Sequence, residues 1–261
     1  MELINELFEF YEDYKEEKGF IGFSVKGCPI PYFAVKNGGF PVAVLTGAIH
    51  AREYVTGYVL LKEIGYLKTA VFPGKVYVIP VVNPDGVKVV KSVKNYKANA
   101  NGVDLNANFP ARYGTGEKNV KRRGFSDYIG KYPLSEEESK ALYYFTESAN
   151  PDFTLSLHTK GEEIYYDFYD EFLAKRDYKY ALIAEKLMGY KVVKNLPSAG
   201  GYKDLCVGRY KIPSLTTECG SDDLIHPIDK SHADEIFGRI KDIPPEILKE
   251  IYRDKNGRKE S

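Results

Sequence analysis

Two residues that can bind a metal ion, His50 and Glu53, stand three positions apart just after the apolar run 42–45. An imidazole in a turn and a carboxylate at the start of the following helix can converge on one zinc ion, with a third ligand from elsewhere in the chain. The same spacing also occurs without a metal, when the glutamate caps a helix and the histidine is hydrogen-bonded. The pair alone therefore leaves both interpretations open.

A second histidine and a second glutamate also directly follow predicted strands: His158 follows the short apolar run 153–157, and Glu218 follows residues 213–217. In open α/β sheets, ligands bind at the carboxyl ends of the strands, so these side chains are expected to meet His50 and Glu53. Two imidazoles and one carboxylate leave a zinc coordination position open, which is the catalytic pattern. We therefore predict His50, Glu53 and His158 as metal ligands. Glu218 is the predicted general base.

The elements that must position these residues are predicted by alternating apolar runs and helical periodicity. Residues 42–45 and 76–82 are predicted strands, and residues 53–67 between them have apolar positions at helical spacing. This strand–helix–strand unit implies parallel pairing with a right-handed crossover, as in an α/β protein. Further strands are predicted at residues 21–25, 32–35, 153–157, 191–193 and 213–217, and further helices at residues 2–17, 135–148, 178–188 and 244–252.

Two long irregular segments interrupt this pattern, at residues 87–101 and 114–130. The first follows a predicted turn at residues 83–86, and after the second a capping-box sequence predicts a helix start at Ser135. Long loops in compact domains are usually functional or mobile. Four basic residues of the second loop are compatible with a solvated surface or with a loop that closes over a substrate. They are Lys118, Lys121, Arg122 and Arg123.

The 261 residues are expected to form a single domain, 1–261, with a core at about residues 20–240 and peripheral helices at both ends. Lys plus Arg and Asp plus Glu number 37 each, so no overall charge attracts nucleic acid or a membrane, and a small peptide partner is expected. Three cysteines without a Cys-x-x-Cys pair argue against a disulfide framework. The acidic N-terminus lacks the features of a secretory signal, so we expect a cytoplasmic location. The oligomeric state is not predicted.

Five sequence motifs occur in the order that is typical of one enzyme family. They are His50-Ala51-Arg52-Glu53, Asn83-Pro84-Asp85-Gly86, Gly102-Val103-Asp104-Leu105-Asn106, Leu155-Ser156-Leu157-His158 and Leu215-Thr216-Thr217-Glu218. With these motifs the chain resembles the zinc metallocarboxypeptidases. The resemblance implies one Zn2+ per chain and hydrolysis of an amide bond. It also implies an α/β fold with a central, mixed and mostly parallel eight-stranded twisted sheet that helices cover on both faces.

Three further segments are most similar to one bacterial branch of that family. They are residues 96–106, 158–166 and 200–204. The branch contains γ-D-glutamyl-L-diamino acid peptidases and murein peptide amidases, so the resemblance predicts hydrolysis of γ-D-glutamyl–diamino acid bonds in cell-wall peptides. One alternative is a general carboxypeptidase that releases C-terminal amino acids. The other is a catalytically inactive zinc-binding or peptide-binding relative, although a binding protein has no need of a general base such as Glu218.

The resemblance also implies roles for five residues outside the ligand set. Lys97 aligns with the family's oxyanion-stabilising arginine, and Arg52 is expected to face the substrate. Asn106 and Asn99 are expected to contact the substrate, and Lys203 is expected to bind a substrate carboxylate. Four of these residues also have structural alternatives. Lys97 and Lys203 would then be surface lysines. Arg52 would orient a ligand through an ion pair, and Asn106 would be a turn residue.

The chain departs from the family at positions that matter for substrate binding. Ala107 stands where the family usually has an arginine that binds the substrate's C-terminal carboxylate. Asn101 stands where relatives of the diamino acid branch tend to have another arginine. Strict carboxypeptidase activity is therefore open to question.

Overall fold

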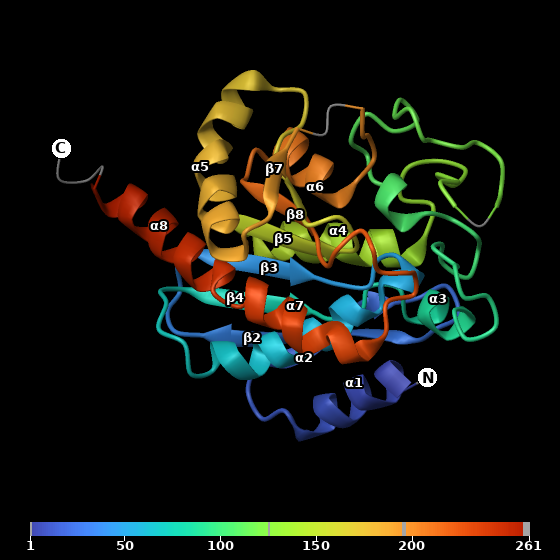
Figure 1. Cartoon of the computed structure of the whole chain (residues 1–261), viewed down its shortest axis with the longest axis horizontal. Helices are drawn as coiled ribbons and strands as arrows, with labels where there is room; N and C mark the ends of the chain where they lie inside the picture. Colours follow the sequence, from blue (N-terminus) through green and yellow to red (C-terminus); the bar gives the residue numbers. More distant parts are fainter. Residues whose placement is uncertain (1, 125, 195–196, 258–261) are drawn as a thin grey trace.

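One eight-stranded sheet runs through the molecule, whose computed structural model describes residues 2–124, 126–194 and 197–257 (Figure 1). The strands are β1 (Lys18–Phe23), β2 (Pro29–Lys36), β3 (Val42–Thr46), β4 (Lys75–Ile79), β5 (Phe153–His158), β6 (Glu163–Tyr165), β7 (Lys191–Val193) and β8 (Ser214–Glu218). Their order is β1-β2-β4-β3-β5-β8-β6-β7. The β3–β4, β3–β5, β5–β8 and β6–β7 pairs are parallel, and the other three are antiparallel. The predicted mixed, mostly parallel sheet is confirmed.

Helices cover both faces of this sheet. The α-helices are α1 (Glu2–Asp13), α2 (Val55–Leu67), α3 (Pro84–Val89), α4 (Glu137–Ala149), α5 (Glu171–Met188), α6 (Tyr202–Leu205), α7 (Ala233–Ile240) and α8 (Ile243–Gly257). Shorter turns are η1 (Ala51–Glu53), η2 (Leu105–Ala107), η3 (Cys206–Tyr210) and η4 (Lys230–His232). Leu45 of β3 belongs to a buried cluster with α1, α2, α5, α7 and α8, whereas Val44 belongs to a second cluster with α4 and α6. Because successive strand side chains point to opposite faces, the two clusters mark the two helical layers.

The register of the parallel strands aligns the ends at which the candidate residues stand. Leu45 of β3 pairs with Leu155 of β5, and Leu155 pairs with Leu215 of β8. All three leucines are fully buried, as expected for strands covered on both faces. Three residues further along, His158 pairs directly with Glu218. The register of the strands therefore places His158 and Glu218 side by side at one edge of the sheet.

The start of α3 differs from the sequence prediction. Residues 83–86 were expected to form a turn, but Asn83 caps a helix that begins at Pro84. The side-chain oxygen of Asn83 accepts a hydrogen bond from the amide of Gly86 at 3.0 Å. Asparagine and proline favour helix starts as well as turns, so the local sequence is compatible with both structures.

The starts of two other helices, α5 and α4, also differ from the sequence prediction. Helix α5 begins at Glu171, earlier than predicted, because Asp170 caps it by accepting a hydrogen bond from the amide of Leu173 at 3.0 Å. The expected capping box at Ser135 does not form. The cap of α4 is Glu136, and the Ser135 hydroxyl donates to the carboxylate of Glu136 at 2.7 Å instead.

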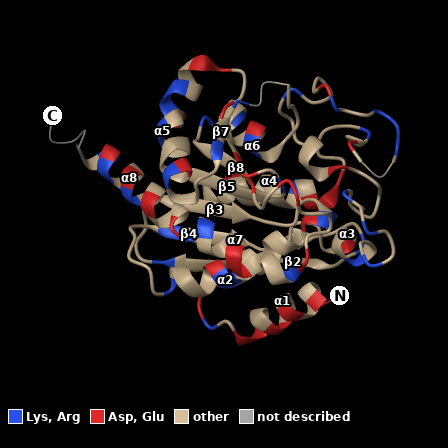
Figure 2. Ribbon diagram, in the orientation of Figure 1, with Lys and Arg blue, Asp and Glu red and all other residues tan. Residues whose placement is uncertain are grey.

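Charged side chains of both signs are interspersed along the helices and loops (Figure 2), in line with the equal totals of 37. Among the described helices, none has the length and apolar character needed to cross a membrane. The domain boundaries and the cytoplasmic location stay predictions.

Helix α2, which packs against α7, buries the carboxyl group of Glu63. Glu63 is 0% exposed, and neither of its carboxylate oxygens has a hydrogen-bond partner in the described part of the chain. Burial, aided by the negative charge of Asp242, raises the pKa of Glu63 well above its usual range. The folded protein therefore favours the protonated form, because an unpaired buried carboxylate is costly.

We predict that Glu63→Met stabilises the protein, and more at pH 8 than at pH 5. The folded-state pKa of Glu63 lies above the unfolded value of about 4.3, so the stability of the wild type falls as the pH rises through this interval. Methionine does not ionise and has a similar size, so a gain of about 1–3 kcal/mol is expected at pH 8. Urea unfolding at both pH values measures this, with the exposed change Glu9→Met as control. Equal effects of Glu63→Met at both pH values would contradict the prediction.

Candidate metal and catalytic site

A tight turn after β3 carries two of the predicted metal ligands, His50 and Glu53. The amide of Ala48 donates to Thr56 Oγ1 at 2.8 Å, and this hydroxyl donates to the carbonyl of Glu53 at 2.8 Å, which ties the turn to α2. Gly47 has no room for a side chain, because a Cβ there would lie 2.9 Å from a backbone carbonyl oxygen of the loop after β4. Packing and hydrogen bonds thus fix the backbone conformation of the turn that leads into η1.

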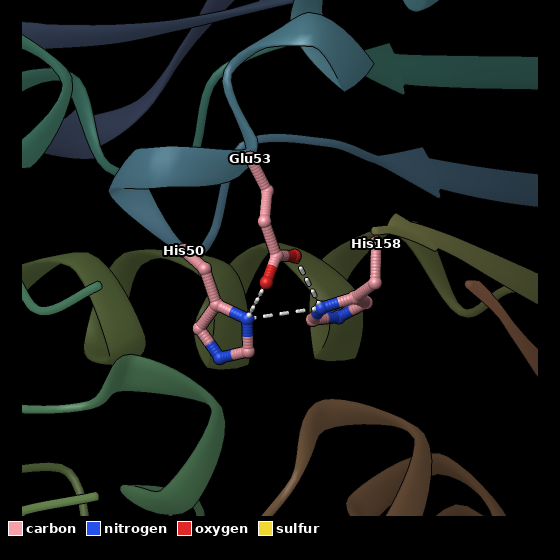
Figure 3. A group of neighbouring side chains, drawn as sticks. All are labelled: His50, Glu53 and His158. Atoms are coloured by element: carbon pink, nitrogen blue, oxygen red, sulfur yellow. Dashed lines mark hydrogen bonds and ion pairs between the residues drawn. The ribbon is translucent and has the colours of Figure 1, made fainter. Parts of the chain in front are cut away.

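The side chains of His50, Glu53 and His158 converge on one point beyond the ends of β3 and β5 (Figure 3). Glu53 lies between the two rings: its Oε1 is 2.9 Å from His50 Nδ1, and its Oε2 is 3.0 Å from His158 Nδ1. The two Nδ1 atoms are 3.1 Å apart. Ligand atoms around a tetrahedral zinc ion with bonds of about 2.0–2.1 Å are about 3.3 Å apart, close to these values. The structure thus brings the three predicted ligands together.

The protonation of His50 also fits a cation in this cluster. Its Nε2 is 3.1 Å from Asp104 Oδ1, so each ring nitrogen faces a carboxylate. A neutral imidazole carries one proton, and if Nε2 donates it to Asp104, the lone pair of Nδ1 faces Glu53 and His158. Burial opposes a charge on this ring, but Glu53 and Asp104 raise its pKa to about 9 in the protein alone. A metal ion satisfies the same groups without a second proton.

Asp104 and Lys97 extend the charged network from His50. The buried carboxylate of Asp104 accepts a hydrogen bond from the amide of Asn106 at 3.0 Å, and its Oδ2 is 2.6 Å from Lys97 Nζ. Burial opposes its charge, but Lys97 and His50 hold its pKa below the usual range. Lys97 also lies 2.9 Å from Asp127, and the two carboxylates outweigh burial and raise the lysine pKa. The predicted oxyanion residue therefore lies near the cluster, with its charge shared between two carboxylates.

The predicted general base, Glu218, lies on β8 directly beside His158 of β5. It is partly exposed, and its carboxylate has no hydrogen-bond partner among the described residues. Burial and then the negative charge of Glu53 raise its pKa to about 8. A bound metal cation acts in the opposite direction. A carboxyl group whose pKa lies near neutrality can take up and release a proton, as general acid–base catalysis requires.

A cavity of about 220 Å³ opens beside His50. Its walls include Asn106, Ala107, residues 116–119 of the basic loop and residues 197–199. Pockets for drug-sized ligands have volumes of about 300–1,000 Å³, so this smaller cavity suits a group such as one amino acid residue.

The sequence of this chain is similar to those of known proteins. A family model described as zinc carboxypeptidase matches residues 14–198. The chain belongs to the zinc carboxypeptidase family. It is 30% identical to the gamma-D-glutamyl-L-diamino acid endopeptidase 1 of Lysinibacillus sphaericus, over 83% of this chain and 63% of that protein. It is 28% identical to the murein peptide amidase A of Escherichia coli (strain K12), over 52% of this chain and 57% of that protein.

Solved structures share the fold of this zinc carboxypeptidase family member. Thrombin activatable fibrinolysis inhibitor gives a TM-score of 0.79 at 21% identity, covering 96% of this chain and 77% of that chain. The murein-tripeptide amidase MpaA from Escherichia coli O157 gives a TM-score of 0.66 at 21% identity, covering 90% of this chain and 93% of that chain. The chain spans less than two thirds of the length of either sequence relative. The family match confirms the predicted family and, with the His–Glu–His group, zinc as the metal, whereas hydrolysis by this chain stays a prediction.

Arg52, which stands between two of the zinc carboxypeptidase ligands in the sequence, contacts the segment after α3. Its Nη1 donates to Asn95 Oδ1 at 2.9 Å, and its buried Nε has no partner among the residues that the structure describes. Within the same residues no carboxylate pairs with it, so the alternative of a ligand-orienting ion pair has no support there. The expected contact with substrate stays a prediction.

Asn99 lies in a buried hydrogen-bond network. Its Nδ2 donates to the carboxylates of Glu136 and Glu138, at 2.8 and 3.1 Å. Its Oδ1 accepts from the amides of Asn101 and Val103, at 3.0 and 3.1 Å. Both polar atoms of the side chain thus serve to order the chain before η2. The predicted substrate contact of Asn99 gains no support from this geometry.

Asn106 lines the cavity beside His50, whereas Lys203 does not, and the two side chains differ in how many of their polar atoms are already bound. Asn106 Oδ1 accepts from the amide of Tyr202 at 2.9 Å, which leaves Nδ2 without a partner among the described residues. Lys203 is 5% exposed and donates to the carbonyl of Asp167 at 2.5 Å and to Asp204 Oδ1 at 2.8 Å. Lys203 is therefore not a surface lysine, and a substrate carboxylate would compete with Asp204 for it. Both assignments stay predictions.

Two acidic residues of the site, Asp104 and Asp127, were not among those predicted from the sequence. Asp104 stands inside a motif used for the resemblance, and its position just before a turn that holds Asn106 was the available signal. Asp127 stands in the basic loop, and nothing in the local sequence connects it with Lys97.

We predict that Asp104→Asn weakens zinc binding by about 10- to 100-fold, because the ring of His50 loses the carboxylate that orients it and increases its basicity. Competition with a chelator at fixed pH measures the affinity. Asp127→Asn is the matched control, since it removes the other carboxylate partner of Lys97 without touching His50. Equal losses of affinity in the two variants would contradict the role of Asp104.

Proposed function

We propose that this chain is a zinc-dependent metallopeptidase that hydrolyses γ-D-glutamyl–diamino acid bonds in small cell-wall peptides. The observation that carries the proposal is the convergence of His50, Glu53 and His158, with Glu218 on the neighbouring strand. A buried three-ligand site next to an unpaired carboxylate suits the activation of water. The relatives' names, which refer to γ-D-glutamyl-L-diamino acid and to murein peptide, support the substrate class.

Each protein group has a defined task in this reaction. Zinc supplies Lewis-acid chemistry that polarises the substrate carbonyl and makes water easier to deprotonate. Glu218 accepts a proton from the attacking water as the water oxygen bonds to the amide carbon. The same carboxyl group then donates this proton to the amide nitrogen as the C–N bond breaks, so a free carboxyl group and a free amine result. Lys97 adds positive charge near the developing oxyanion, reduced by its two aspartate partners.

Two hollows, of which the first is lined by His50, offer space for the two parts of a peptide. The cavity beside His50 would hold the residue that leaves as the amine. A larger hollow of about 550 Å³ is lined by Tyr54, Tyr58 and His226 among others, and Tyr54 directly follows the ligand Glu53. Its size suits the longer, acyl part of the substrate.

An inactive binding protein is the competing proposal. Two observations favour an inactive binding protein: Lys97 is already paired with two carboxylates, and Ala107 provides no guanidinium. The unpaired carboxyl group of Glu218 beside the ligand His158 argues against it, since a binding site has no need of a general base there.

We predict that Glu218→Gln lowers kcat for L-Ala-γ-D-Glu-diaminopimelate by about 10²- to 10⁴-fold, while the zinc content stays at one ion per chain. Metal analysis and release of diaminopimelate provide the two readouts. Glu163→Gln is the matched control, because Glu163 pairs with Glu218 across β6 and β8 but is bonded to the Tyr165 hydroxyl. A wild type that holds zinc and cleaves neither this peptide nor a simple C-terminal peptide would rule out the proposed function.

A further inference from the structure

Two lysines, Lys97 and Lys118, line the cavity beside His50, and they differ in their partners. Lys97 faces Asp104 and Asp127 at 2.6 and 2.9 Å. Lys118 is exposed and forms no hydrogen bond or ion pair with any residue that the structure describes. An anionic group that enters the cavity therefore meets one ammonium that is already paired with two carboxylates and one ammonium that is unpaired.

The backbone of the basic loop holds Lys118 at the cavity. The amide of Gly116 donates to Asn119 Oδ1 at 3.0 Å, and the amide of Asn119 donates to the carbonyl of Gly116 at 3.0 Å, which closes a tight turn. The amide of Glu117 donates to the carbonyl of Pro197, in another wall segment, at 3.2 Å. The turn that carries Lys118 is therefore tied to a second part of the cavity wall.

Two further unpaired groups line the same cavity. The Oδ1 of Asn106 accepts a hydrogen bond from the amide of Tyr202. The Nδ2 of the same side chain has no partner among the described residues. Glu117 is exposed and, within the described ranges, has no ion-pair partner. One ammonium, one amide NH2 and one carboxylate together complement a small group that carries both a carboxylate and an ammonium.

We propose, on the basis of the proposed function, that Lys118 binds a carboxylate of the residue that leaves as the amine, next to the contact already expected of Asn106, while Glu117 pairs with an ammonium on that residue. The cavity then selects a zwitterionic residue, and its volume of about 220 Å³ limits the selection to one residue. A carboxylate can come from the end of the peptide main chain or from a side chain, as in diaminopimelate. Both sources present the same chemistry to Lys118.

Binding to zinc-loaded Glu218→Gln protein separates recognition from hydrolysis. Calorimetry would compare L-Ala-γ-D-Glu-diaminopimelate, its derivative amidated at the main-chain carboxyl group, and L-Ala-γ-D-Glu-L-Lys. Adding the substitution Lys118→Met to the Glu218→Gln protein is expected to raise the Kd of the first peptide about five- to tenfold. The peptide that lacks the carboxylate bound by Lys118 is insensitive to the change, which identifies the source. Adding Glu117→Gln is expected to raise the Kd of all three peptides about threefold, since all three carry the ammonium.

Lys121→Met is the matched control, because Lys121 belongs to the same loop and does not line this cavity. It is expected to change each Kd by less than about twofold. Equal Kd values with and without Lys118→Met, or no binding of any peptide, would overturn the proposal. Binding that depends on Lys118, combined with a wild type that cleaves nothing, would overturn the proposed function and support the role of Lys118.

Discussion

The carboxylate of Glu53, held between two imidazole nitrogens at 2.9 and 3.0 Å, is the interaction on which the rest of the site depends. A buried carboxylate without partners is unfavourable, so the fold must bring proton donors or a cation to it. His50 and His158 are 108 positions apart in the sequence. They meet because β3 and β5 are adjacent and parallel, so that both strands end at the same edge of the sheet. The metal site is thus a direct consequence of strand order.

A line of alternating groups extends from this carboxylate through His50, Asp104 and Lys97 to Asp127. Each contact lowers the cost of burying the next charge. With a neutral His50, three carboxylates face one ammonium, and the line carries excess negative charge. Either a second proton on His50 or a divalent cation corrects this imbalance. Metal binding and proton release are therefore coupled in this network.

The sheet and the ligand positions were predictable because both depend on the same apolar runs. β3 is an almost continuous apolar run, as a strand covered on both faces requires, and His158 is the last residue of β5, whose residues are all buried. The pairing of Lys97 with Asp127 was not predictable, because it depends on how two aperiodic loops fold against each other. The same holds for Asn99, whose amide is bound by Glu136 and Glu138 from the start of α4. Burial of Glu63 also escaped prediction, since a single charge on a helix is normally solvated.

In the proposed function, the sheet positions the groups that do the chemistry and the loops position the groups that select the substrate. Ala107 lies in η2, a turn that Asp104 caps, where an arginine would bind a carboxylate from a rigid support with a planar, bidentate guanidinium. Lys118 lies instead in a loop, and its ammonium acts as a point charge on a flexible stem. Such a cation tolerates several carboxylate positions, but on binding it loses more rotational freedom than an arginine held on a rigid turn. In the proposed role of Lys118, a positive charge on the loop instead of the turn favours a substrate whose carboxylate position varies, over the fixed carboxylate of an ordinary peptide C-terminus.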